Sequence, residues 1–255
     1  MSGLQFQGQH ALVTGGTRGI GRAIAEALAG AGATVTVLGR NREALEKLID
    51  QGEAHRAAVA DVADAEAVRK AVEEAAAGSG PIDLLIANAG AAASAPFLKT
   101  GPDIFRQMLD VNLLGVANAA QAVLKPMVDR GFGRIVAVAS TASLKGYPYV
   151  TAYCAAKHAV IGLVRALALE TAQTGVTINA VCPGYTDTDL VSKSLDRIVD
   201  KTGRSREEAL KEFVKHNPQG RLVAPQEVAD TVLWLCGRGA SAVTGQAIAV
   251  AGGEI

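Results

Sequence analysis

Short apolar runs alternate with longer helical patterns along the whole chain. The apolar runs are mostly continuous, as in Arg134–Ala139 (RIVAVA), which is typical of a parallel sheet covered on both faces. Strands that alternate with helices of roughly ten or more residues indicate β-α-β units. We predict strands over His10–Thr14, Thr34–Leu38, His55–Ala60, Ile82–Ala87, Arg134–Ala139, Val176–Val181 and Gln246–Val250. We predict helices over Ile20–Ala31, Arg42–Gln51, Asp64–Ala77 (with Asp64 as N-cap), Pro102–Arg130 and Val150–Gln173, and another that begins near Pro225.

This alternation predicts a single α/β domain over residues 1–255. We expect a doubly wound (Rossmann) three-layer sandwich, with a seven-stranded parallel sheet and helices on both faces. One charged segment, residues 189–219, departs from the rhythm. Because ligands in open α/β sheets bind beyond the carboxyl ends of the strands, we expect this segment to be a flap over the site.

Composition and charge exclude several classes of protein. Hydrophobic residues make up 49% of the 255 residues and charged residues 20%, as in an ordinary globular protein. The net charge of +0 predicts no nucleic-acid partner and no membrane-surface partner. Residues 1–10 have no signal-peptide pattern, and no uncharged apolar run reaches the ~18 residues of a transmembrane helix.

The cysteines and histidines bear on location and metals. Cys154, Cys182 and Cys236 are odd in number and widely spaced, which favours a reducing compartment over a disulfide framework or a zinc site. We therefore expect a cytoplasmic protein. The four histidines have no ligand spacing, so we expect no catalytic metal.

A glycine-rich loop follows the first predicted strand and leads into the first predicted helix. Its sequence is Thr14–Gly21 (TGGTRGIG). In this context glycines let backbone N–H groups and the helix N-terminus face a pyrophosphate. Alternatively, the glycines only permit close packing of the helix on the strand.

Tyr153 and Lys157 form a pair suited to proton transfer. A free tyrosine has a pKa of ~10, and a neighbouring ammonium lowers that value. Positions i and i+4 share a helix face, so Lys157 can lie beside Tyr153. Ser140, at the carboxyl end of a predicted strand, can bind a substrate oxygen. Tyr147 and Tyr149 are nearby but have no lysine four positions later.

The chain resembles the short-chain dehydrogenase/reductase family over essentially its whole length. The motifs that carry the resemblance are T-G-x-x-x-G-x-G at Thr14–Gly21, Asn88-Ala89-Gly90, Asn112 in the long helix, Ser140, Tyr153-x-x-x-Lys157 and Pro183-Gly184. The resemblance implies that Tyr153 transfers the proton, Lys157 holds the nicotinamide ribose and lowers the Tyr153 pKa, and Ser140 binds the carbonyl oxygen. It also implies that Asn112 distorts its helix and holds a water.

Each of these residues also has a purely structural interpretation. Asn112 can be a satisfied polar residue within a helix, and Lys157 a solvated helix charge. Ser140 can be an N-cap, and Ser143 is close enough to compete with it.

Motif and resemblance together give a set of cofactor-binding residues. Asp61-Val62 resembles the family's adenine contact, although Asp61 can also be a turn or N-cap residue. Many relatives have Val or Ile where Thr186 stands. The full set is Gly15, Thr17, Arg18, Gly19, Ile20, Arg40, Asp61, Val62, Asn88, Ala89, Gly90, Tyr153, Lys157, Pro183, Gly184, Thr186 and Thr188.

The end of the second predicted strand indicates which dinucleotide is bound. NAD-dependent relatives often carry Asp where this chain has Gly39, and Arg40 follows. Arg18 is a second cation, and a guanidinium suits a 2′-phosphate. We therefore expect NADP(H), with NAD(H) as the alternative if Arg40 is only solvated or stacks on adenine.

Among relatives, the stretches around Ser140, Tyr153 and Cys182 most resemble β-ketoacyl and polyketide ketoreductases and 3-hydroxyacyl dehydrogenases. The expected function is interconversion of a ketone and a secondary alcohol, with a 3-oxoacyl thioester or similar hydrophobic ketone as substrate. The alternatives are an NAD-dependent secondary-alcohol dehydrogenase and a non-catalytic dinucleotide sensor. An enoyl reductase is disfavoured because its Tyr and Lys are spaced more widely.

The resemblance also suggests which residues line the substrate site and how the subunits assemble. The flap cations can bind thioester phosphates or only be solvated. The family implies a homotetramer, with the helices at 102–130 and 150–173 in one interface. Residues expected to face the substrate are Ala91–Leu98, Thr141, Ala142, Leu144, Tyr147, Tyr149, Tyr185 and the flap, whose cations are Lys193, Arg197, Lys201, Arg204, Arg206, Lys211 and Lys215.

Overall fold

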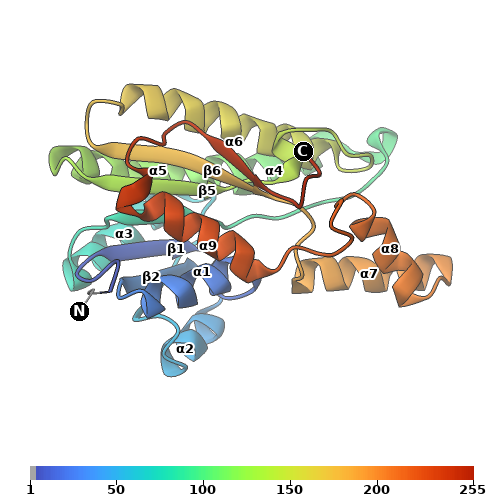
Figure 1. Cartoon of the computed structure of the whole chain (residues 1–255), viewed down its shortest axis with the longest axis horizontal. Coiled ribbons are helices and arrows are strands. Elements are labelled where there is room, and N and C mark those ends of the chain that lie inside the picture. The colour runs from blue at the N-terminus through green and yellow to red at the C-terminus, as the bar shows by residue number, and fades with distance from the viewer. Residues whose placement is uncertain (1–3) are drawn as a thin grey trace.

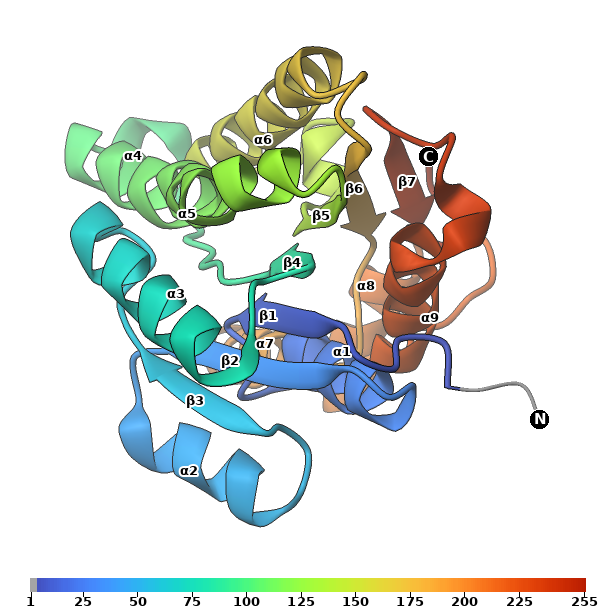
Figure 2. The same cartoon turned by 90° about the vertical axis from the view of Figure 1, so that its left-hand side faces the viewer.

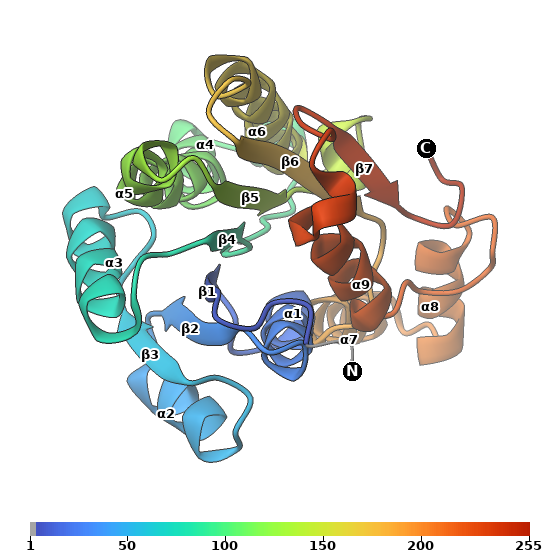
Figure 3. The same ribbon diagram turned by 60° about the vertical axis from the view of Figure 1, so that its left-hand side comes forward.

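A seven-stranded parallel sheet forms the centre of the molecule, with strand order β3-β2-β1-β4-β5-β6-β7 (Figures 1 and 3). The computed structural model describes residues 4–255, without the side chains of residues 190, 197, 198 and 201. The predicted doubly wound α/β fold is confirmed. The strands are β1 (His10–Thr14), β2 (Thr34–Gly39), β3 (Arg56–Val59), β4 (Leu84–Ala87), β5 (Gly133–Val138), β6 (Val176–Pro183) and β7 (Ala247–Val250).

Helices cover both faces of the sheet because successive strand residues point to opposite sides. In β1, Leu12 packs into one core while Ala11 and Val13 pack into the other. Helices α3 (Ala65–Ser79), α5 (Gly115–Asp129) and α6 (Thr151–Glu170) cover the first face, and α1 (Gly19–Gly30), α2 (Arg42–Asp50) and α9 (Pro225–Cys236) cover the second (Figure 2). The predicted N-cap Asp64 accepts hydrogen bonds from the N–H groups of Glu66 and Ala67.

The long helix predicted over Pro102–Arg130 is interrupted. It consists of α4 (Pro102–Leu109), a π-helical turn over Asp110–Leu114, and α5. A π-turn places an extra residue in the helix and occurs often at functional sites. Asn112 lies in the middle of this turn and is fully buried.

The segment expected to be a flap forms two helices, α7 (Asp189–Thr202) and α8 (Arg206–Val214). They lie beyond the end of the sheet where β6 leaves it (Figure 1). Ser205 and Glu208 form a capping box at the start of α8. Val191, Leu195 and Ala209 join the two helices in a small apolar cluster that also includes Tyr185.

Helix α6 differs from one sequence prediction. By length and composition alone it is apolar enough to cross a membrane, although the sequence predicted no such helix. In the fold α6 packs against β6 and α4 and buries Lys157, Val160 and Val164. We interpret it as a core helix whose apolar face belongs to the sheet.

Candidate active site

The glycine loop connects β1 to α1 in a conformation that only glycine adopts easily. Gly15 and Gly19 have φ values of 66° and 54°. A Cβ on Gly19 would lie 3.1 Å from the Cγ2 of Thr188, so the loop runs beside the segment after β6. Arg18 precedes α1 and makes no side-chain cap within the described chain. The first N–H groups of α1 are therefore available for an anion.

Asn88 and Ala89 fasten the segment after β4 to the glycine loop. The Asn88 amide donates to the carbonyls of Thr14 and Gly15, both at 3.0 Å. The Thr14 hydroxyl accepts the N–H groups of Asn88 and Ala89, again at 3.0 Å each. Thr14 was predicted as part of the glycine-loop motif, but no role was predicted for its hydroxyl. The available signal was a hydroxyl at the last position of a buried apolar strand.

The residues expected at the adenosine end gather at the carboxyl ends of β2 and β3. Arg40 lies 3.4 Å from the Asp61 carboxylate, and its side chain is 76% exposed. Arg40 lies with Asn41, Arg42 and Glu43 on a solvent-open part of the surface. Val62 is buried, and its carbonyl accepts a hydrogen bond from Asn118.

Two more predicted cofactor residues lie near this end. Gly39 would place a Cβ 3.9 Å from Thr17, so the glycine loop and the end of β2 are neighbours. Arg18, which follows Thr17 in the glycine loop, is exposed.

Asn112 links the π-turn to the segment after β4. Its amide donates to the carbonyls of Ala91 and Met108 at 2.9 and 3.0 Å, and its oxygen accepts the Ala91 N–H at 3.2 Å. The side chain is thus a satisfied polar group inside a helix. The distortion expected from the resemblance is also present, while the proposed water-holding role stays a prediction.

Ser140 follows β5, and its hydroxyl lies near enough to the Tyr153 side chain, in the first turn of α6, to lower the Tyr153 pKa. The Ser140 hydroxyl also accepts the Ala142 N–H at 3.1 Å and so caps the short helix Thr141–Ser143. The capping interpretation and the contact with Tyr153 therefore both hold. Ser143, the competing serine, is 4% exposed, and its hydroxyl is buried without a hydrogen-bond partner among the described atoms.

Lys157 lies beside Tyr153 on α6. Its Nζ is 5.9 Å from the centre of the Tyr153 ring and donates to the Val138 carbonyl at 2.9 Å. A Cβ on Gly90 would lie 3.6 Å from this Nζ and 2.9 Å from the Asn112 oxygen. Gly90 therefore leaves room for Lys157 and Asn112 to approach each other from two helices.

The direction of the Tyr153 pKa shift differs from the expectation. Burial raises the Tyr153 pKa, and the hydrogen bond from Ser140 lowers it by less. Burial also lowers the pKa of Lys157 to about 8. In the protein alone, desolvation dominates the Tyr153 pKa, whereas the neighbouring lysine was expected from the sequence to be dominant.

The segment after β6 carries Pro183, Gly184, Thr186 and Thr188. The buried Thr186 donates its hydroxyl to the Gly184 carbonyl at 3.0 Å, and Thr188 donates to the Thr186 carbonyl at 3.3 Å. The Thr186 hydroxyl thus stabilises its own turn. The backbone near Thr186 also forms a β-bridge with Val223, where the chain returns from the flap.

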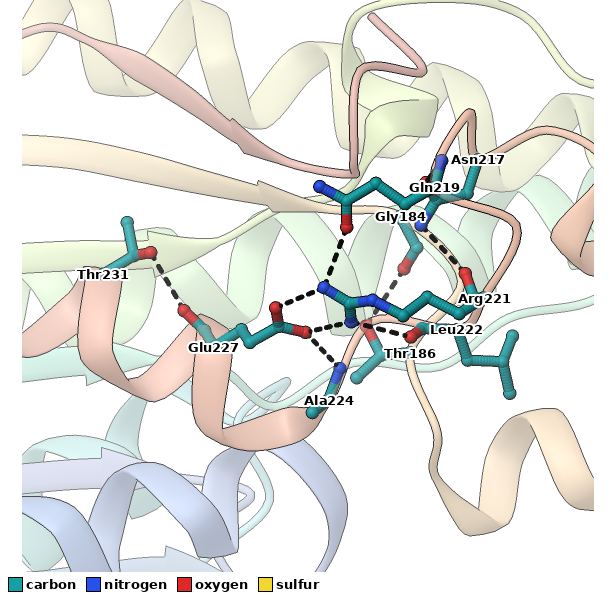
Figure 4. A network of polar contacts seen from close by, with 9 residues as sticks. All are labelled: Gly184, Thr186, Asn217, Gln219, Arg221, Leu222, Ala224, Glu227 and Thr231. Carbon is teal, nitrogen blue, oxygen red and sulfur yellow. Dashed lines mark hydrogen bonds and ion pairs between the residues drawn. The ribbon is translucent and has the colours of Figure 1, made fainter.

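An ion pair fixes this return segment to α9 (Figure 4). Both terminal nitrogens of Arg221 bond the Glu227 carboxylate at 2.7 Å, and Glu227 also accepts the Ala224 N–H at 2.8 Å. The hydrogen bond from Arg221 and, to a smaller extent, the one from the Ala224 N–H lower the pKa of Glu227 to about 2. The carboxylate therefore stays charged, and the segment around Val223, which bridges to Thr186, is held in place.

Aromatic side chains meet between the flap and the Ser140 loop. The Tyr185 ring packs edge-on against Phe213 of α8, with ring centres 4.7 Å apart, and against Tyr147 at 6.2 Å. Thr141 and Ala142 are buried, whereas Tyr149 is exposed with a φ of 67°.

Most described flap cations are in ion pairs on the flap surface. The pairs are Arg204–Glu212, Arg206–Asp196, Lys211–Glu207 and Lys215–Glu212. This pairing favours the solvated interpretation of these charges. The side chains of Arg197 and Lys201 lie outside the described part of the structure.

The described residues contain no cluster of three His, Cys, Asp or Glu side chains placed to hold a metal. Cys154, Cys182 and Cys236 are buried free thiols.

Comparison with known proteins supports the motif assignment. Residues 9–198 match the family model of short chain dehydrogenases. The chain is 38% identical to a candidate ketoacyl reductase of Streptomyces coelicolor (95% of each chain) and 36% identical to an acetoacetyl-CoA reductase of Rhizobium meliloti (96% and 97%). A variant of actinorhodin polyketide ketoreductase solved with NADPH superposes with a TM-score of 0.92, at 38% identity over 96% and 97% of the two chains. The chain therefore belongs to the short-chain dehydrogenase/reductase family and is a nicotinamide-dependent oxidoreductase that interconverts a ketone and an alcohol.

Proposed function

We propose that the protein is an NADP(H)-dependent reductase of a 3-oxoacyl thioester or a similar hydrophobic ketone. The observation that carries the proposal is the contact of Ser140 with Tyr153, with the Lys157 ammonium 5.9 Å from the Tyr153 ring. The Lys157 ammonium lies near Gly90, and Asn88, two residues before Gly90, is bonded to the glycine loop. A nicotinamide ring and a carbonyl can meet between these groups.

The residues present fit a dinucleotide. A Cβ on Gly15 would lie 2.8 Å from the Cα of Ala89 and one on Gly19 3.1 Å from the Cγ2 of Thr188, so these glycines let the loop approach the segments after β4 and β6. The first N–H groups of α1 are available for a pyrophosphate. The cofactor, when bound, supplies the hydride. The residues of the predicted set outside the glycine loop lie on α6 or at or directly after the ends of β2, β3, β4 and β6.

The chain's own residues orient the substrate and move the proton. The Ser140 hydroxyl binds the carbonyl oxygen, and the Tyr153 hydroxyl donates its proton to that oxygen as negative charge develops. The Lys157 ammonium favours the resulting phenolate because opposite charges attract strongly where water is excluded. Asn112 keeps the π-turn and the Ala91 backbone in place beside Lys157.

Arg40 supports a preference for NADP(H). Its guanidinium is largely exposed just after β2, on a solvent-open surface that it shares with Arg42. A planar guanidinium binds phosphate oxygens in pairs, and no carboxylate stands at Gly39 to repel a 2′-phosphate. The structurally similar polyketide ketoreductase, solved with NADPH, agrees with this preference. NAD(H) is the alternative if the Asp61 pairing holds Arg40 away.

The relatives and the aromatic residues support a hydrophobic ketone. One relative acts on acetoacetyl-CoA by name, and another similar protein is a polyketide ketoreductase. Tyr147 and Tyr185 present apolar rings near Ser140. Since most described flap cations are already paired, recognition rests on the acyl or ring part of the substrate more than on phosphates.

We also propose a cytoplasmic homotetramer. Its Ala-rich helices α5 and α6 permit close packing between subunits, and Leu114 and Leu169 are exposed there. The buried free thiols are compatible with a reducing compartment. Analytical ultracentrifugation that shows only monomers would contradict the assembly, and fractionation that finds the protein outside the cytoplasm would contradict the location.

The decisive experiment tests a panel of ketones and acyl thioesters against purified protein with NADPH and with NADH. We expect ketone-dependent oxidation of NADPH, with kcat/KM higher for 3-oxoacyl or cyclic apolar ketones than for small polar ones. Faster turnover with NADH would overturn the cofactor proposal. Tight NADPH binding without oxidation on any ketone of the panel would instead favour a dinucleotide sensor.

A further inference from the structure

Glu254 is a carboxylate buried next to the proposed active site. It follows β7, and its side chain is 1% exposed. Its Oε1 accepts the Tyr147 hydroxyl at 2.5 Å and pairs with the Lys145 ammonium at 3.0 Å. Its Oε2 would lie 3.2 Å from a Cβ on Gly184, so the carboxylate also packs on the segment after β6.

The Tyr147 hydroxyl connects Glu254 to the residue after Ser140. It lies 2.5 Å from Glu254 and 2.7 Å from the Thr141 hydroxyl. The Tyr147 hydroxyl has a single hydrogen to donate, so it donates to the Glu254 carboxylate and accepts from the Thr141 hydroxyl. Burial and the Glu254 contact raise the pKa of Tyr147, which therefore stays a neutral donor. The direction of the hydrogen bonds is fixed as Thr141 to Tyr147 to Glu254.

These contacts restrain the loop that joins the two groups of the proposed proton transfer. Ser140 stands at one end of the loop and Tyr153 stands just beyond the other. Tyr147 lies between them, so its anchor limits movement of both ends.

Residues of the flap return pack on the same segment. Cβ atoms added to Gly252 and Gly253 would meet Asn217 and Pro218, and the Tyr147 ring lies 6.2 Å from the His216 ring. The segment after β7 is therefore held between the flap return and the Ser140 loop.

We propose that Glu254 is a positioning residue for ketone reduction. With Lys145, Tyr147 and Thr141 it forms the Glu254 cluster, which holds the Ser140–Tyr153 loop against the segment after β6 and so sets the distance between the proton donor and the substrate. This inference rests on the proposed function. Stability alone is a weak reason for such a group, because buried ion pairs often stabilise a fold less than apolar residues of similar volume.

The test compares Glu254→Ala, Glu254→Gln and Tyr147→Phe with the control Glu74→Ala, which removes an exposed carboxylate from α3. We expect Glu254→Ala to lower kcat/KM for the ketone by about tenfold to a hundredfold, as misplacement of a reacting group does. Glu254→Gln retains an acceptor for Tyr147 and should recover part of that loss. NADPH affinity should stay within about twofold of wild type in all variants.

A second measurement does not depend on turnover. Hydrogen exchange of the peptide covering residues 141–152 should be faster in Glu254→Ala and Tyr147→Phe than in Glu74→Ala, because the loop loses its anchor. If Glu254→Ala does not fold, the isosteric Glu254→Gln and Tyr147→Phe provide the same comparison.

The outcomes separate this inference from the proposed function. A wild-type protein that reduces no ketone defeats the proposed function, and the exchange of residues 141–152 then decides whether Glu254 anchors the loop. Unchanged exchange overturns the inference in any case. Faster exchange with an unchanged kcat/KM in an active enzyme makes Glu254 merely structural and also overturns it.

Discussion

Asn112 and Ala91 exchange a reciprocal pair of hydrogen bonds between the π-turn and the segment after β4. The Asn112 amide donates to the Ala91 carbonyl at 2.9 Å and accepts the Ala91 N–H at 3.2 Å. The extra residue of the π-turn places Asn112 inside the fold, where it is fully buried. Two segments that are far apart in the sequence are thereby fixed beside Lys157.

Replacing Asn112 by Ala should affect both stability and activity. The substitution leaves the Ala91 N–H and carbonyl without their partner, which costs about 1–3 kcal/mol for a buried polar group. We expect a lower free energy of unfolding by denaturant titration, and kcat/KM reduced at least tenfold because Gly90 and Lys157 shift. Asn179→Ala is the control, because the equally buried Asn179 amide also donates to a backbone carbonyl (Val243) and accepts a backbone N–H (Gln246). Equal losses of activity in both variants would contradict a special role for Asn112.

Tyr153→Phe should abolish turnover and leave the fold and cofactor binding intact. Phe fills the same volume but has no proton to donate, so kcat should fall by at least about a hundredfold. NADPH binding, followed by fluorescence titration, should match the wild type. Tyr149→Phe is a matched control, because Tyr149 is exposed and is not followed by a lysine four positions later. Full activity of Tyr153→Phe would end the assignment.

Lys157→Met should make the protein more stable near neutral pH while it removes activity. Burial lowers the folded-state pKa of Lys157 to about 8 from 10.5, so the folded state disfavours the charged lysine. The free energy of unfolding therefore falls as the pH drops from 10.5, the pKa of Lys157 in the unfolded chain, through about 8, its pKa in the fold. Near pH 7 the buried charge lowers the free energy of unfolding by about 3 kcal/mol. Loss of the bond to the buried Val138 carbonyl offsets about 1–3 kcal/mol of the gain.

The measurement is thermal unfolding of both proteins without cofactor, near pH 7 and near pH 10. We expect Lys157→Met to have the higher Tm near pH 7 and the difference to shrink near pH 10, where the wild-type lysine is mostly neutral in the folded state. A lower Tm for the variant at both pH values would show that the charged Lys157 does not destabilise the folded protein.

Arg40→Gln should change the choice of dinucleotide. Loss of the guanidinium removes the proposed partner of the 2′-phosphate, so kcat/KM with NADPH should fall about tenfold or more while kcat/KM with NADH stays nearly constant. Steady-state kinetics with both cofactors measures this ratio. Arg69→Gln, on the exposed face of α3, should leave the ratio unchanged. A fall of equal size with both cofactors would instead indicate that Arg40 stacks on adenine.

The sequence alone determined the fold class and the main motifs. Continuous apolar runs specify strands buried on both faces, and this requirement is local enough to read from Arg134–Ala139 without coordinates. The glycine loop and the Tyr153–Lys157 spacing are also local, because each depends on backbone freedom or on the helical period. Element boundaries differed by one or two residues at most sites, as helix and strand ends usually do.

Only the tertiary structure decided how distant residues act on one another. The direction of the Tyr153 pKa shift depends on desolvation by elements that the sequence does not place beside it. The choice between Ser140 and Ser143 depends on which hydroxyl faces Tyr153. Glu254 gave no sequence signal, because a single Glu has no period, and Thr14 was identified only as the first residue of the glycine-loop motif. Their burial and their bonds to Asn88 and Tyr147 exist only when β1 meets β4 and the segment after β7 meets the Ser140 loop.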